Sequence, residues 1–173
     1  EYLANAVPDL RGIMIQDDML TNKRAMEISE GILKRGLEKR FEWSCYAKPN
    51  SNLSEETLKL MKKSGCLNLH VGFESGNEEV LKNIDKGSTV EEAINFADLS
   101  HKAGLQLHAD FAMGHLGESY DSMEDTVKLA KRINPHTAQF QVMIPFKGTK
   151  FWTQIDDLRA WSDNSKSTPS YES

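Results

Sequence analysis

A glycine-rich turn at residues 114–119, Gly-His-Leu-Gly-Glu-Ser, follows a stretch of alternating polar and apolar residues. Gly114 and Gly117 let backbone amides approach a ligand closely, and Glu118 adds a carboxylate. A helical pattern begins near Ser119, so the amide end of that helix points at the same place. The spacing predicts a ligand-binding turn after a strand; a merely tight connection is the alternative.

Polar side chains also follow the other four strand patterns of the chain. They are Asp17 and Asp18, Lys48, Glu74 and Ser75, and the segment 147–149. The carboxyl ends of parallel strands meet at one edge, where the following loops build active sites. The sequence therefore predicts one binding site assembled from several strand ends.

Five strand patterns alternate with helical patterns, which predicts right-handed crossovers and an α/β fold with a parallel sheet. The strands are expected at 12–18, 41–47, 67–73, 105–113 and 138–144. Buried parallel strands usually read as continuous apolar runs, but these alternate, so one face of the sheet is polar. Burying unpaired polar groups costs about 1–3 kcal/mol each, so a wet, incomplete barrel suits them best. Residues on this face include Tyr46, His70, His108, Asp110 and Gln141.

Bulk composition narrows the class of protein. The formal charge of −5 argues against a nucleic-acid surface, and no apolar run is long enough to span a membrane, so we expect a cytoplasmic protein. Cys45 and Cys66 lack metal-ligand spacing and are expected to pack as small hydrophobes. Residues 1–152 are interpreted as the barrel, and 153–173 as a polar tail or linker without periodicity.

Six short motifs resemble the radical S-adenosylmethionine (SAM) superfamily, in the branch that often carries an N-terminal cobalamin-binding domain. They occur in the family's order: Gln-Asp-Asp-Met-Leu-Thr (16–21), Met-Lys-Lys-Ser-Gly-Cys (61–66), Val-Gly-Phe-Glu-Ser-Gly (71–76), Leu-Lys-x-Ile-x-Lys-Gly-x-Thr (81–89), Gly-x-x-Gly-Glu-Ser (114–119) and Pro-x-x-Gly-Thr (145–149). The resemblance implies a partial parallel (βα)6 TIM-like barrel with strands two to six present. It also implies SAM and a [4Fe-4S] cluster as cofactors, with cobalamin as a further cofactor of the longer protein.

Carried over by position, the resemblance assigns cofactor contacts to the strand ends. Asp17 and Asp18 stand near the methionine end of SAM, and Lys48 replaces a usual arginine there. The remaining cofactor contacts are Glu74 and Ser75 for the methionine or ribose groups, Gly114, Gly117 and Glu118 near the adenine, and Gln141 in the last strand. Tyr46, His70, His108 and Asp110 are the expected substrate contacts.

The family's Cys-x-x-x-Cys-x-x-Cys loop is not in this sequence. Three thiolates hold such a cluster, so we interpret the chain as a fragment whose cluster is ligated by an upstream segment. Alone it is not expected to generate the 5'-deoxyadenosyl radical used for hydrogen abstraction or methyl transfer. A small-molecule substrate and a one-electron donor such as flavodoxin or ferredoxin are the expected partners.

Two other functions remain open from the residues. One is a divalent-metal-dependent barrel lyase or isomerase that uses Glu74, His108, Asp110 and Glu118. The other is a non-catalytic relic that binds the nucleoside cofactor without doing chemistry.

Overall fold

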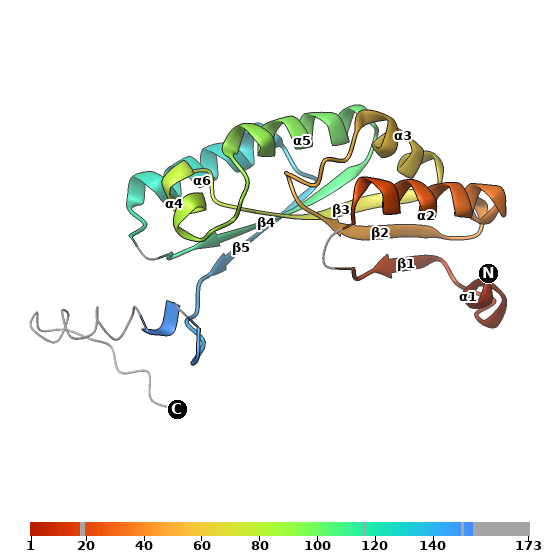
Figure 1. Ribbon diagram of the computed structural model, residues 1–173, viewed down its shortest axis with the longest axis horizontal. Coiled ribbons are helices and arrows are strands. Elements are labelled where there is room, and N and C mark those ends of the chain that lie inside the picture. The colour runs from red at the N-terminus through yellow and green to blue at the C-terminus, as the bar shows by residue number, and fades with distance from the viewer. Residues whose placement is uncertain (18–19, 116, 150, 154–173) are drawn as a thin grey trace, which may run out of the picture. The chain divides into compact units, whose positions relative to one another are not determined.

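A computed structural model describes residues 1–17, 20–115, 117–149 and 151–153. Its five parallel strands form one sheet in sequence order (Figure 1). The strands are Gly12–Ile15 (β1), Glu42–Ala47 (β2), Cys66–Glu74 (β3), Gln106–Met113 (β4) and Thr137–Val142 (β5). The α-helices are Tyr2–Ala6 (α1), Asn22–Lys34 (α2), Glu55–Lys63 (α3), Glu78–Asn83 (α4), Val90–Lys102 (α5) and Tyr120–Ile133 (α6), with a 3-10 turn at Leu37–Lys39 (η1).

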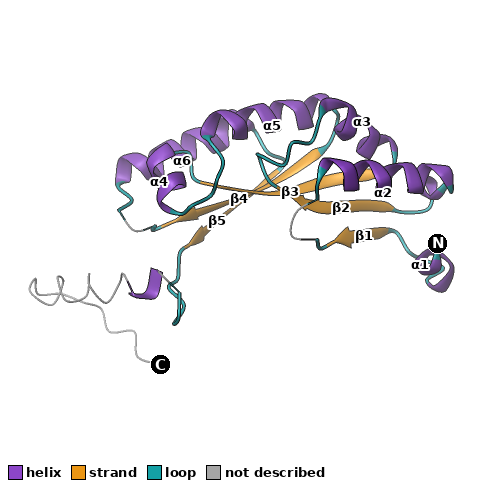
Figure 2. Ribbon diagram, viewed as in Figure 1, coloured by secondary structure: helices purple, strands orange, loops and turns teal. Residues whose placement is uncertain are grey.

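The connection order identifies the sheet as part of a barrel. Helices α2 to α6 all lie over one face of the sheet (Figure 2). Right-handed crossovers that always step in the same direction place every connecting helix on the same face. A doubly wound sheet would reverse direction and carry helices on both faces. The α/β fold with a partial, TIM-like parallel barrel is therefore confirmed.

The helices begin at the caps that the sequence indicates. Thr21 and Ser54 each accept a hydrogen bond from the backbone amide three residues later. Thr89 and Glu92 form the predicted capping box at the start of α5. Capping satisfies backbone amides that a helix leaves free at its first turn, so these side chains fix where each helix starts. They thereby set the length of the strand-to-helix loops.

The apolar face of strands β2 to β4 packs under the helices as expected, whereas Phe140 and Val142 of β5 are exposed. Trp43, Leu69, Val71 and Phe111 are at most 1% exposed. Both cysteines are buried and free. Alternation along β3 places Leu67 on the apolar face with Leu69, but the β2–β3 register shifts between Trp43 and Ser44, and Leu67 is only partly buried and lines a pocket with Ser44 and Asn68. A strict period of two fails wherever one strand carries an extra residue.

The chain divides into two units, residues 1–141 and 142–173. The first contains nearly all of the sheet and its six helices. The second is described only to Thr153, and its described part includes a turn in which Thr149 donates to the carbonyl of Phe146. Most of the predicted polar tail, from residue 154, lies outside the described residues. No described helix is long and apolar enough to cross a membrane.

Candidate functional site

The polar face of the sheet is built in rows, because paired residues on neighbouring parallel strands point the same way. Tyr46, His70 and His108 are paired in register across β2, β3 and β4. We call these three residues the ring row. The row that precedes it along the strands holds Met14, Ser44, Asn68 and Gln106. Side chains from segments far apart in sequence thus meet on one surface, as the alternation predicts.

A pocket of about 380 Å³ opens beside the ring row, toward the carboxyl ends of the strands. We call it the upper pocket. Two lysines line it, and neither arginine nor a carboxylate is among its lining residues. Its lining consists of Gln16, Tyr46, Ala47, Lys48, His70, Gly72 and Lys86. Lys86 is paired with the nearby Glu74, so Lys48 leaves one net positive charge at the pocket, which suits a ligand with an anionic group.

Lys86 is a site residue that the strand-end pattern did not predict, because it comes from the loop between α4 and α5. Its ammonium donates to Glu74 Oε1 over 2.9 Å, and both side chains are largely buried. Glu74 has a left-handed backbone with φ of 65°, next to a shift in the β3–β4 register. This irregularity turns the Glu74 carboxylate back over Gly72, where a Cβ would lie 2.6 Å from Oε1.

The ring row forms a chain of aromatic contacts. The ring centroids of His70 and His108 lie 4.8 Å apart, and those of Tyr46 and His70 lie 5.5 Å apart. His108 Nδ1 shares a 2.6 Å hydrogen bond with Thr137 Oγ1, and its Nε2 lies 3.4 Å from Asp110. The contact with Thr137 of β5 and the nearby Asp110 hold the His108 ring in place.

Partial burial lowers the pKa of His70, and the neighbouring His108 lowers it further, while Asp110 opposes the change. His70 has no hydrogen-bond partner among the described residues. The lowered pKa favours the neutral imidazole, which lines the upper pocket.

The glycine-rich turn is closed by its own carboxylate. Glu118 Oε2 accepts hydrogen bonds from the amides of Gly114 and His115, at 2.6 and 3.2 Å. The other oxygen, Oε1, is buried without a partner among the described residues, as is His115 Nε2. Two of the turn's backbone amides are thus occupied by Glu118. Its buried polar atoms without a partner among the described residues are a carboxylate oxygen and an imidazole nitrogen.

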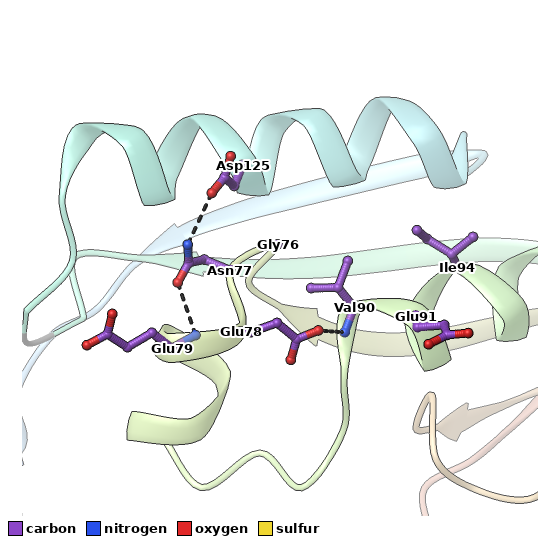
Figure 3. Close-up of a pocket in the computed structure, with 8 residues that line it drawn as sticks. All are labelled: Gly76, Asn77, Glu78, Glu79, Val90, Glu91, Ile94 and Asp125. Carbon is purple, nitrogen blue, oxygen red and sulfur yellow. Dashed lines mark hydrogen bonds between the residues drawn. The ribbon is translucent and has the colours of Figure 1, made fainter.

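Ser75 lies away from the polar face. It is fully buried, and its hydroxyl lies 3.1 Å from Thr126 Oγ1 of α6. The next residues form the edge of a pocket of about 610 Å³ between α4, α5 and α6, where Asn77 donates to Asp125 (Figure 3). This larger pocket lies on the helical side and shares no residue with the upper pocket, so we do not assign the site to it.

The remaining predicted residues lie at the margins of the polar face. Asp17 is exposed just after β1, and Asp18 lies outside the described residues. Gln141 is exposed on β5, in alternation with Phe140, whose ring stacks on Phe111 at 4.9 Å. Since Thr137 contacts His108, alternation places Gln141 on the polar face as well.

The described residues do not fit a bound metal or an iron–sulfur cluster. No group of three or more histidine, cysteine or acidic side chains in the described part of the chain could hold a metal ion. Glu74, His108, Asp110 and Glu118 are therefore not gathered as a metal-dependent lyase would need. Cys45 and Cys66 are the sequence's two cysteines, and a [4Fe-4S] cluster of this kind needs three thiolates.

The fold is a segment of a parallel barrel, and the candidate site is a cationic pocket at its strand ends. Similarity to known proteins identifies the family. Residues 10–130 match the Radical SAM superfamily. The chain belongs to this superfamily, and membership implies SAM and a [4Fe-4S] cluster as cofactors.

The curated relatives are several times longer than this chain. An uncharacterised methyltransferase of Pyrococcus horikoshii is 32% identical over 145 residues, covering 83% of this chain and 31% of the relative. The bacteriochlorophyllide d C-12(1)-methyltransferase of Chlorobaculum tepidum is 27% identical over 136 residues, covering 78% and 29%. The chain therefore spans about a third of the length of these relatives.

Solved structures share the fold. The radical SAM methyltransferase TsrM from Kitasatospora setae, solved with cobalamin and a [4Fe-4S] cluster, aligns with a TM-score of 0.77 at 18% identity and covers 97% of this chain and 33% of TsrM. The cobalamin-dependent radical SAM enzyme OxsB aligns with a TM-score of 0.67 at 19% identity, covering 94% and 24%. At these identities the likeness shows a shared fold, and the predicted kinship with the cobalamin-associated branch stays a prediction.

Proposed function

We propose that this chain is the SAM-binding part of a radical SAM enzyme, and that the cofactor binds on the polar face with its methionine end in the upper pocket. The observation that carries the proposal is the pair of lysines, Lys48 and Lys86, in a pocket at the strand ends of a family member. The methionine end of SAM carries a carboxylate, and a lysine ammonium binds a carboxylate as a compact point charge.

Lys86 can hold that carboxylate without releasing Glu74. An ammonium has three donors, and the ion pair with Glu74 Oε1 uses one of them. Glu74 in turn keeps acceptor capacity for hydroxyl groups such as those of a ribose. Asp17 and Asp18 stay candidates for the amino group, and Gly114, Gly117 and Glu118 for the adenine. The free Glu118 Oε1 is an acceptor suited to an exocyclic amine.

SAM bound beside a reduced [4Fe-4S] cluster supplies a 5'-deoxyadenosyl radical or a methyl group to a small-molecule substrate. The thiolates that hold the cluster would come from a segment outside this chain. The chain's own residues bind and orient the cofactor, and His70 contributes an imidazole on the polar face. The one-electron donor, flavodoxin or ferredoxin, and a cytoplasmic location belong to the same proposal, as does cobalamin in the longer protein.

The test is the affinity of the chain for S-adenosylhomocysteine, which keeps the carboxylate and adenosine of SAM, measured by isothermal titration calorimetry. Lys86→Met removes the charge and keeps the apolar stem. A hydrogen bond to a charged group contributes about 1.5–3 kcal/mol, so this variant should bind at least about tenfold more weakly.

Lys63→Met is the matched control, because Lys63 is exposed on α3 and away from the pocket. It should bind like the wild-type chain. Equal affinity of the Lys86→Met variant and the control would remove Lys86 from the site and the methionine end from this pocket.

A further inference from the structure

A second pocket of about 390 Å³ lies on the polar face, beside the row that holds Ser44 and Asn68. We call it the lower pocket. It shares no residue with the upper pocket. Its row lies two residues before the ring row on each strand, a distance of about 6–7 Å along the sheet. A molecule in the lower pocket can therefore extend past the ring row to a cofactor in the upper pocket.

One side-chain oxygen in this row is buried without a hydrogen-bond partner among the described residues. Asn68 and Gln106 are paired in register on β3 and β4, and Asn68 Oδ1 is buried. A buried polar atom without a partner costs about 1–3 kcal/mol, and asparagine is also unfavourable within a strand. No described residue offsets these two costs, so a ligand that donates a hydrogen bond to the Asn68 amide oxygen would offset the first of them.

The chemistry of the lining limits what such a ligand can be. Met14 and Leu67 supply an apolar surface, and the Ser44 hydroxyl is occupied by Met14 Sδ at 2.9 Å. No lysine or arginine lines the pocket, and its one charged lining residue is Glu42. An anionic group is therefore disfavoured, while a neutral molecule with an apolar body fits.

We propose that the lower pocket binds a substrate through a cis-amide edge, a hydrogen-bond donor beside an acceptor, which Asn68 pairs with. Lactams, carboxamides and nucleobases present such an edge, and an asparagine side chain can bind it with two hydrogen bonds. Asn68 is then a specificity-determining residue, and Gln106 lies beside it on the next strand. Describing the ligand as a substrate rests on the proposed function, whereas the binding itself does not.

The probe pair is 2-pyridone, which has the cis-amide edge, and 1-methyl-2-pyridone, in which a methyl group blocks the donor. Each is titrated into the ¹⁵N-labelled chain, and affinity is read from chemical shifts, including the side-chain amide signals of Asn68 and Gln106. We expect 2-pyridone to shift these signals saturably at millimolar concentration, and the methylated probe to bind at least about tenfold more weakly.

Variants separate the pocket from non-specific binding. Asn68→Leu should lower the affinity for 2-pyridone at least about tenfold, whereas Asn95→Leu, on the exposed side of α5, should leave it unchanged. If the leucine variant does not fold, Asn68→Asp keeps the size and loses the donor, and it should show the same loss.

Equal affinity for the two probes, unchanged binding to a folded Asn68 variant, or no shift at Asn68 would each overturn the proposal. Binding of S-adenosylhomocysteine is scored in a separate titration of the same chain. Failure of the lower pocket is thereby distinguishable from failure of the cofactor site.

Discussion

His70 has an unusual place among the residues of the site. It lines the upper pocket, contacts both other rings of the ring row and has no hydrogen-bond partner among the described residues. His108 by contrast is held by Thr137 and lies close to Asp110. Neighbouring side chains therefore hold the His108 imidazole, whereas the His70 imidazole remains available to accept a hydrogen bond from a ligand in the upper pocket.

The pKa of His70 should respond in opposite directions to its two neighbours. Replacing His108 with glutamine removes a group that disfavours the protonated ring, so the pKa of His70 should rise toward its ordinary value. Replacing Asp110 with asparagine removes a favourable charge, so the pKa should fall further. A pH titration of the imidazole signals by NMR measures both. Shifts of the same sign in the two variants would contradict this account of the ring row.

Titration of His70 also makes the free energy of unfolding depend on pH. Because folding lowers the pKa of His70, the unfolded chain binds a proton more readily between the unfolded value of about 6.5 and the folded value. The contribution of His70 to the free energy of unfolding is therefore complete above about pH 6.5 and declines as pH falls through that interval.

At the scale of elements, the junction between β3 and α6 positions the start of α4. Gly76 lies against the backbone of α6, where an added Cβ would come within 2.3 Å of the Asp125 carbonyl oxygen. The hydroxyls of Ser75 and Thr126 meet next to it, and Thr126 Oγ1 also accepts from the Gly76 amide. The Glu-Ser-Gly sequence thus has a packing role in addition to the cofactor contact proposed for Glu74.

Gly76→Ala should therefore destabilise the fold by about 1–3 kcal/mol or more, because the backbone of α6 must move to admit the methyl group. Gly31→Ala is the matched change within α2, where the nearest atom to an added Cβ is 3.5 Å away, at the end of the flexible Arg35 side chain. It should stabilise by about 0.5–1 kcal/mol through helix propensity. Urea unfolding of both variants provides the measurement, and equal midpoints would show that α6 does not press on Gly76.

The elements themselves could be predicted from the sequence, since a period of two and a period of 3.6 residues are both clear along the chain. The site could be predicted only in part. Lys86 was missed because it lies in a loop between two helices and is separated along the sequence from the strand end that it contacts, Glu74. The sequence did contain one indication of Lys86, because it is part of the Leu-Lys-x-Ile-x-Lys-Gly-x-Thr motif. That motif indicated the family but assigned no role to the lysine.

Ser75 illustrates a limit of transfer by resemblance. Counting in twos from Val71 and Phe73 places Ser75 on the helical face, where the structure has it. The backbone irregularity that turns Glu74 over Gly72 comes from tertiary packing, which a local pattern does not encode. The cofactor roles assigned to Ser75, Gly114, Gly117 and Gln141 stay predictions.

At the scale of the molecule, the chain buries one face of a parallel sheet under helices and leaves the other face polar. The upper and lower pockets, both lined by described residues, lie apart on the polar face, and Lys48 and Lys86 line the upper one. The larger pocket between α4, α5 and α6 lies on the opposite, helical side of the sheet. In the proposed function the nucleoside cofactor binds on the polar face.

A chemical-shift map of the ¹⁵N-labelled chain with S-adenosylhomocysteine tests this claim most directly. We expect saturable shifts at Tyr46, Lys48, His70 and Glu74, with small changes along α5 and α6. Shifts confined to the groove around Asn77, Val90 and Asp125, or no saturable shift at about 10 mM ligand, would contradict the account.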